Sequence, residues 1–198
     1  MSVPTTELEG CARSHRRLFD DVANLTDRQA TEPSLLPDWT VGHVITHLAR
    51  NADSVTRRLE GAARGAVVEQ YPGGYAGRAA EIAAGAFRPA AALIEDLLAS
   101  TERLESAWDG LPSDAWGQPT RDVSGAERPA RTMVLSRWKE VEVHHADLGL
   151  GYTPEDWPRE LMVAWLPREL ERLAVRSDLC DLLAWLSGRG PAPSLAAW

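Results

Sequence analysis

The stretch TVGHVITHLAR (residues 40–50) predicts the class of fold and also holds the first candidate ligands. Its apolar residues recur at intervals of three and four, which is the period of a helix with one buried face: Val41, Val44, Ile45 and Leu48. Thr40 stands just before them and suits the N-cap of a helix. We therefore expect a helix over about residues 41–63, with His43 and His47 one turn apart on a second face.

A later stretch, RWKEVEVHHADLG (residues 137–149), is also helical in pattern. Glu140 and His144 are four residues apart, so a helix places them one turn apart on the same face. Two imidazoles and one carboxylate from two helices can make a zinc site with an open fourth position, as catalysis requires. His47, Glu140 and His144 are therefore candidate metal ligands.

The spacing alone leaves other interpretations open. A histidine or glutamate on a helix is often just a solvated side chain, but four of the five histidines fall in these two short stretches. His43 competes with His47 as a ligand or could support one. Asp147 could orient a ligating imidazole, as carboxylates behind metal sites do. His145 falls within the apolar stripe and is expected to pack or hydrogen-bond in the core.

The rest of the chain also has a helical pattern and no strong strand period, which predicts an all-α protein. Four regions make a four-helix bundle with one long crossover, at about residues 4–25, 41–63, 76–109 and 130–147. Pro89 should kink or split the third of them. Residues 110–129 read as an irregular crossover or a short hairpin, and two further helices are expected at about 154–174 and 178–187. We therefore divide the chain into a bundle over residues 1–150 and a helical extension over 151–198.

The composition limits the partners. The 198 residues are 44% hydrophobic and 25% charged, with a net charge of −8, which argues against a nucleic-acid partner. No apolar run is long enough to span a membrane, and the N-terminus lacks the features of a signal peptide. Cys11 and Cys180 form no CxxC pair, which excludes a cysteine metal cluster. We expect a cytoplasmic protein, a monomer or a homodimer.

Four segments resemble the mycothiol-dependent maleylpyruvate isomerase family, within the DinB-like bundle superfamily. They are LPDWTVGHVITHLARNAD (36–53), GYAGRAAEI (74–82), RWKEVEVHHADLG (137–149) and DLLAWLSGRG (181–190). The resemblance implies a DinB-like four-helix bundle with His47, Glu140 and His144 as the metal ligands. It further implies that Arg78 is catalytic, since its guanidinium can bind a substrate carboxylate through two hydrogen bonds.

The resemblance also implies the chemistry. The expected cofactors are Zn²⁺, or another divalent metal, and mycothiol as a thiol cosubstrate. The expected substrate is a small anionic or electrophilic molecule, isomerised from cis to trans by addition of the thiolate, rotation and elimination. Family members often carry a further α/β domain near the C-terminus, most of which is absent here. Two alternatives therefore remain open: a mycothiol S-transferase acting on electrophiles, and a non-catalytic bundle that binds a metal or a ligand.

Overall fold

A computed structural model describes residues 2–195 of the chain. It comprises two compact units, the first ending at Trp157 and the second beginning at Pro158. This division falls seven residues after the boundary expected between residues 150 and 151. That the two segments are separate domains stays a prediction, and each unit is described by itself.

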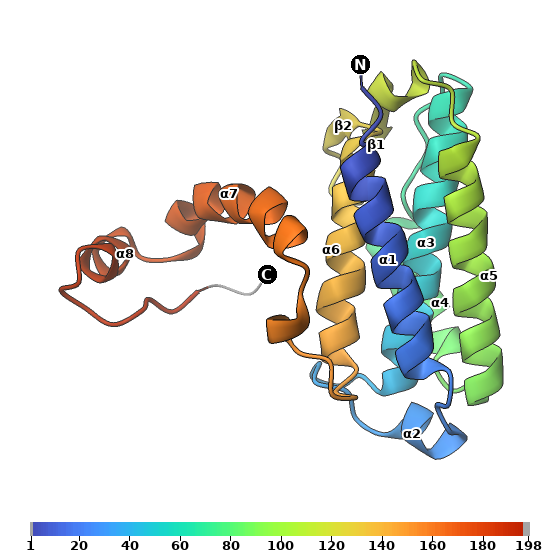
Figure 1. Ribbon diagram of the computed structural model, residues 1–198, viewed down its shortest axis with the longest axis horizontal. Coiled ribbons are helices and arrows are strands. Elements are labelled where there is room, and N and C mark those ends of the chain that lie inside the picture. The colour runs from blue at the N-terminus through green and yellow to red at the C-terminus, as the bar shows by residue number, and fades with distance from the viewer. Residues whose placement is uncertain (1, 196–198) are drawn as a thin grey trace. The chain divides into compact units, whose positions relative to one another are not determined.

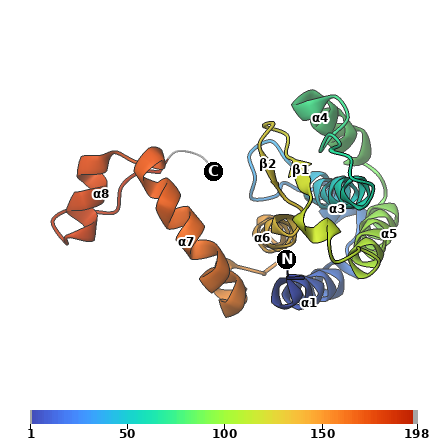
Figure 2. The same cartoon turned by 90° about the horizontal axis from the view of Figure 1, so that it is seen from above.

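The first unit is built around long helices that lie side by side, as Figures 1 and 2 show. They are α1 (Thr5–Val22), α3 (Val41–Ala63), α5 (Ala90–Asp109) and α6 (Thr132–Asp147). Helix α3 packs against α5 and α6, and α1 packs against α6 and α5. This arrangement confirms the predicted all-α bundle. The core side chains come mainly from the apolar stripe of α3 and from α1 and α5, among them Leu18, Ile45, Leu48, Leu93 and Leu97.

Helix α3 begins and ends where the sequence predicts. The Thr40 hydroxyl accepts a hydrogen bond from the backbone N–H of His43, and the His43 side chain bonds back to the backbone of Thr40. Such a reciprocal capping box satisfies two backbone donors that would otherwise lack partners at the start of the helix. It fixes the first turn of α3 and thereby the direction in which His47 projects.

Two of the predicted helices are divided in the structure. The helix expected over residues 4–25 ends at Val22, because Thr26 and Gln29 form a capping box that starts a new short helix, α2 (Asp27–Thr31). The region 76–109 is split as expected into α4 (Gly74–Gly85) and α5, with Pro89 as the N-cap of α5. Helix α4 starts slightly earlier than predicted and lies beside α3.

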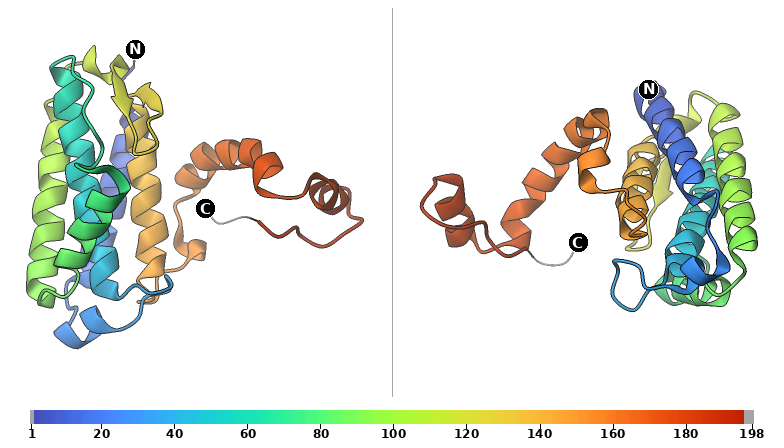
Figure 3. Two further views of the ribbon diagram at one scale, coloured as in Figure 1. Left: turned by 180° about the vertical axis from the view of Figure 1, so that it is seen from behind. Right: turned by 60° about the horizontal axis from the view of Figure 1, so that its bottom comes forward.

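The crossover between α5 and α6 contains a short hairpin. A 3₁₀ turn, η1 (Ala115–Gly117), leads into β1 (Pro119–Arg121), which pairs antiparallel with β2 (Glu127–Pro129). Strand β1 contacts α3 and β2 contacts α6, so the hairpin lies against both helices near one end of the bundle, as Figure 3 shows from behind. The Val123 N–H donates to Gln70 Oε1 at 2.8 Å, which ties the hairpin to the loop after α3.

Helix α1 approaches α6 closely at Gly10. A Cβ atom at this position would overlap the indole ring of Trp138. The indole N–H of Trp138 donates to the Ser14 hydroxyl at 2.7 Å, one turn further along α1. The small residue and the hydrogen bond together hold α6 in register, and with it the residues that α6 presents to α3.

The second unit contains α7 (Arg159–Arg176) and α8 (Leu179–Leu186). Asp178 caps α8 by accepting from the backbone N–H groups of Cys180 and Asp181. Pro167 lies inside α7 without ending it. Residues 191–195 have no regular structure, and residues 196–198 lie outside the described part. Across residues 2–195, none of the helices combines the length and the apolar character needed to cross a membrane.

Candidate metal centre

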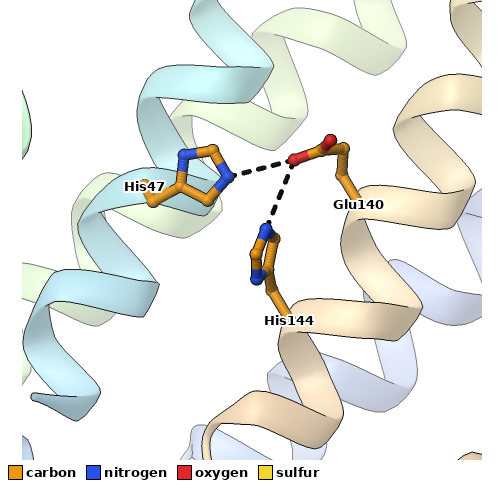
Figure 4. Close-up of side chains that lie close together, drawn as sticks. All are labelled: His47, Glu140 and His144. Carbon is orange, nitrogen blue, oxygen red and sulfur yellow. Dashed lines mark hydrogen bonds and ion pairs between the residues drawn. The ribbon is translucent and has the colours of Figure 1, made fainter. Parts of the chain in front are cut away.

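The structure brings the three predicted ligands together, although two of them lie far from the third in sequence. His47 projects from α3 toward Glu140 and His144 on α6, as Figure 4 shows. Glu140 Oε2 lies 3.0 Å from His47 Nε2 and 3.5 Å from His144 Nε2. One ligand atom of each residue lies within 4.8 Å of the others. We call these three residues the metal cluster.

The spacing of these atoms fits a zinc ion. Zinc bonds of 2.0–2.1 Å in a tetrahedral arrangement place neighbouring ligand atoms about 3.3 Å apart. The two distances measured from Glu140 Oε2, 3.0 and 3.5 Å, fall on either side of that value. Two nitrogens and one oxygen fill three of the four tetrahedral positions, so the donor set leaves one position for an exogenous ligand.

His144 is held by a carboxylate behind it, as the sequence led us to expect. Asp147 Oδ2 lies 2.8 Å from His144 Nδ1, on the side of the ring opposite Nε2. Burial disfavours the charged ring, but the hydrogen bonds to Asp147 and Glu140 outweigh it and raise the pKa of His144 to about 9. The hydrogen bond to Asp147 therefore holds a proton on His144 Nδ1 and directs Nε2 into the cluster.

His47 is almost completely buried and has a different partner behind it. The Arg78 guanidinium donates from Nη2 to His47 Nδ1 at 3.1 Å, so Nε2 carries the proton that faces Glu140. Burial lowers the pKa of His47 to about 4 despite the neighbouring Glu140 carboxylate. Although burial opposes its charge, the bonds from His144 and His47 hold the pKa of Glu140 well below its usual range.

Arg78, the predicted catalytic arginine, lies on α4 at the edge of the metal cluster. Its guanidinium carbon is 5.9 Å from the ring centres of both Trp39 and Tyr71, within cation–π range. Two aromatic faces and one imidazole thus fix the position of the guanidinium beside the cluster. This placement agrees with a role in substrate binding, and that role itself stays a prediction.

The two other histidines of these stretches, His43 and His145, make contacts away from the metal cluster. The His43 ring lies at the start of α3, where Nδ1 is 2.8 Å from the Thr40 hydroxyl, and it is not among the described residues grouped around the cluster. This favours His47 over His43 as the ligand. His145 is buried, stacks on Tyr152 at 3.8 Å between ring centres and lies 3.0 Å from Asp21, so it packs in the core as expected.

Sequence reasoning missed a second feature next to the cluster. A cavity of about 130 Å³ lies between α3, α6 and the hairpin, and Glu140 is part of its wall. Three arginines line it: Arg58 of α3, Arg128 of β2 and Arg137 of α6. Arg137 falls three residues before Glu140 on the same helical face, which was the available signal. We call this space the arginine cavity.

Known proteins are similar to this chain over the part that contains the metal cluster. The model of the mycothiol maleylpyruvate isomerase N-terminal domain matches residues 11–149. A crystal structure of the mycothiol-dependent maleylpyruvate isomerase is 28% identical, with a TM-score of 0.79 over 86% of this chain and 72% of that one. A second crystal structure, of a histidine-to-alanine mutant of the mycothiol-dependent maleylpyruvate isomerase, is 22% identical. Its TM-score is 0.81 over 98% of this chain and 99% of that one, and it supports the fold alone. No curated protein matches the sequence significantly.

Proposed function

The chain belongs to the mycothiol maleylpyruvate isomerase family, an enzyme family, and we propose that it is a zinc-dependent isomerase that uses mycothiol to convert a maleylpyruvate-type substrate from cis to trans. One observation carries the proposal: the metal cluster combines two imidazoles and a carboxylate at zinc spacing and leaves a coordination position for a thiol. The solved relative at 28% identity is named for this thiol and this substrate, which supports the assignment.

Zinc at His47, Glu140 and His144 would supply one piece of chemistry, which is to stabilise a bound thiol as its thiolate near neutral pH. The chain's own cysteines are poor substitutes. Cys11 is buried, and this burial raises the pKa of its thiol far above neutrality. Cys180 is exposed on α8, in the second unit. An external thiol is therefore the nucleophile that this architecture favours.

The reaction itself needs no net proton transfer. The thiolate sulfur bonds to the alkene carbon that is β to the substrate ketone, and the π electrons move onto the ketone as an enolate. The former double bond is then single and can rotate. When the enolate collapses, the C–S bond breaks, the trans double bond forms and the thiolate is regenerated.

Arg78 would bind and orient the substrate. Its hydrogen bond to His47 Nδ1 requires a lone pair on that nitrogen. A ligating His47 Nε2 would leave the imidazole proton on Nδ1, where the guanidinium can no longer donate. Arg78 would then have a free donor beside the cluster, still positioned by Trp39 and Tyr71, for a substrate carboxylate.

The test combines metal analysis with an assay of the purified protein. We expect one zinc per chain and conversion of maleylpyruvate to fumarylpyruvate only when mycothiol is present. Cys11→Ser and Cys180→Ser should keep this activity, whereas Arg78→Met should raise KM for the substrate about 10–100-fold, as expected for a lost charged hydrogen bond. Arg103→Gln, at an exposed arginine paired with Asp53, is the matched control.

Other outcomes would point to the alternatives. Transfer of mycothiol to an electrophile without release of an isomer would indicate an S-transferase. A protein that takes up no zinc, or that takes it up but reacts with neither kind of substrate, would contradict the proposal and favour a binding protein. Loss of activity in Cys11→Ser with zinc still bound would contradict the external thiol.

A further inference from the structure

The arginine cavity contains buried positive charge that no ion pair neutralises within the described residues. Arg137 is completely buried and Arg58 is 7% exposed. Within residues 2–195, neither forms an ion pair with a carboxylate. Placing a guanidinium in the interior without a counter-charge is costly, and a structure that retains two of them needs compensation from elsewhere.

Arg137 is held rigidly but incompletely satisfied. Its Nε donates to His15 Nε2 at 3.2 Å, and Nη1 donates to the Leu48 carbonyl oxygen at 2.8 Å and to Asn51 Oδ1 at 2.9 Å. These bonds use three of the five N–H groups of the guanidinium. The remaining nitrogen, Nη2, is buried and has no hydrogen-bond partner in the described chain.

Arg58 reaches the same cavity from α3. Its Nε donates to the Ser54 carbonyl oxygen at 3.2 Å, which anchors the side chain along its own helix. Burial lowers the pKa of Arg58 to about 10, a sign that the charged form is poorly solvated here. Arg128 adds a third positive charge from the exposed side of the hairpin.

The acidic residues of the cavity are already engaged. Asp122 accepts hydrogen bonds from the backbone of Ser124 and Ala126 and from the Ser124 hydroxyl, all within its own turn. Glu140 faces the two histidines of the metal cluster. Three arginines against these two carboxylates leave the lining net positive, in a chain whose overall charge is −8. Water could satisfy the free N–H groups but could not neutralise the charge.

We infer that the arginine cavity is a second anion subsite, which binds a carboxylate at the end of the substrate opposite the one bound by Arg78. The inference rests on the proposed function for its substrate, since a maleylpyruvate-type molecule carries a carboxylate at each end. The order of contacts supports it: Arg78 bonds to His47, His47 bonds to Glu140, and Glu140 lines the cavity. In such a molecule the double bond lies between a ketone and one of the two terminal carboxylates, so a dicarboxylate held at both ends would present that bond near the metal cluster.

The subsite can be tested without catalysis by using pimelate, an unreactive seven-carbon dicarboxylate, and heptanoate, the monocarboxylate of the same length. Titration calorimetry on the intact zinc-loaded chain should show pimelate binding at least about tenfold more tightly, because charged hydrogen bonds are each worth a factor of this order. Arg58→Gln should remove this preference for pimelate, and Arg128→Gln should reduce it less, because Arg128 is exposed. Arg103→Gln should leave it unchanged.

Equal binding of pimelate and heptanoate would overturn the inference, as would an unchanged preference in Arg58→Gln. Arg58 and Arg128 are the informative positions, because Arg137→Gln could fail to fold after losing its bonds to α1 and α3. The isomerase assay separates this test from the proposed function. Activity without a preference for pimelate would refute the subsite alone, whereas a preference lost in Arg58→Gln without any isomerase activity would refute the reaction alone.

Discussion

The metal cluster and the arginine cavity both lie between α3 and α6 and share Glu140, but their charges differ. In the metal cluster a carboxylate lies against two imidazoles, so the charges largely balance in the absence of a metal. In the arginine cavity, the buried guanidinium groups of Arg58 and Arg137 form no ion pair with a carboxylate within residues 2–195, and the arginines outnumber the carboxylates of the lining. Each site also has a supporting residue behind it: Asp147 behind His144, and His15 behind Arg137. The contrast teaches that one site offers donor atoms suited to a cation, whereas the other offers N–H groups suited to an anion.

The largest effect should come from removing one of the predicted metal ligands. His144→Ala should weaken zinc binding by more than about 100-fold, because even the loss of a residue behind a ligand costs 10–100-fold. His43→Ala, on the same helix as His47 but directed to Thr40, should keep its zinc and serves as the control. Zinc affinity measured by competition with a chelator checks both. Equal losses in the two variants would contradict the choice of His47 over His43.

The residue behind the metal ligand should have a smaller effect. Asp147→Asn keeps a hydrogen bond to His144 Nδ1 but removes the charge, so zinc affinity should fall about 10–100-fold. Chelator competition at constant pH measures the loss. Binding of pimelate to the arginine cavity should change little, since Asp147 is not part of its lining. A large change there would show that the two sites are coupled.

His15, the residue behind the buried Arg137, should make the stability of the protein fall at acidic pH. Burial, partly offset by Glu105, lowers the pKa of His15 to about 4, below the usual 6.5. Between these values the unfolded chain binds a proton that the folded chain does not, so stability falls as the pH drops from 6.5 toward 4. At 1.4 kcal/mol per pKa unit, His15 should account for a loss of about 2 kcal/mol at pH 5 relative to pH 8.

Urea unfolding of the wild type and of His15→Gln at several pH values isolates this contribution. The variant should be less stable at pH 8, where it lacks the native bonds to Glu105 and Arg137, but should lose less on acidification. The difference between the two curves removes the contributions of the other histidines. Parallel curves would mean that His15 has the same pKa in the folded and unfolded chains and would contradict the prediction.

The smallest effect should come from the second unit. The metal cluster and the arginine cavity are built entirely from residues that precede Pro158. A chain ending at Trp157 should therefore keep its zinc affinity and its preference for pimelate over heptanoate within about twofold. If the shortened chain folds by circular dichroism but loses either property, residues 158–198 contribute to these sites. Its failure to fold would instead contradict the predicted domain division.

The sequence predicts the helical parts of the molecule well for a physical reason. The helical period assigns each residue of α3 and α6 to a face, and Thr40 and Pro89 mark helix ends through capping and the missing N–H of proline. The spacing of Glu140 and His144 survives folding because both lie on one rigid helix. The end of α1 was misplaced because the capping box of Thr26 and Gln29 interrupts an otherwise continuous pattern.

By itself, the sequence determined the bundle, the helical face of each candidate ligand and a set of ligands in which His43 and His47 still competed. Tertiary structure favours His47, because the distance between α3 and α6 brings His47 Nε2 within 3.0 Å of Glu140 while capping holds His43 at the helix start. It alone produced the arginine cavity, whose lining comes from α3, a loop, the hairpin and α6. Local periodicity assigns side chains to helix faces, whereas the burial of Arg58 and Arg137 without ion pairs depends on how distant segments of the described chain pack.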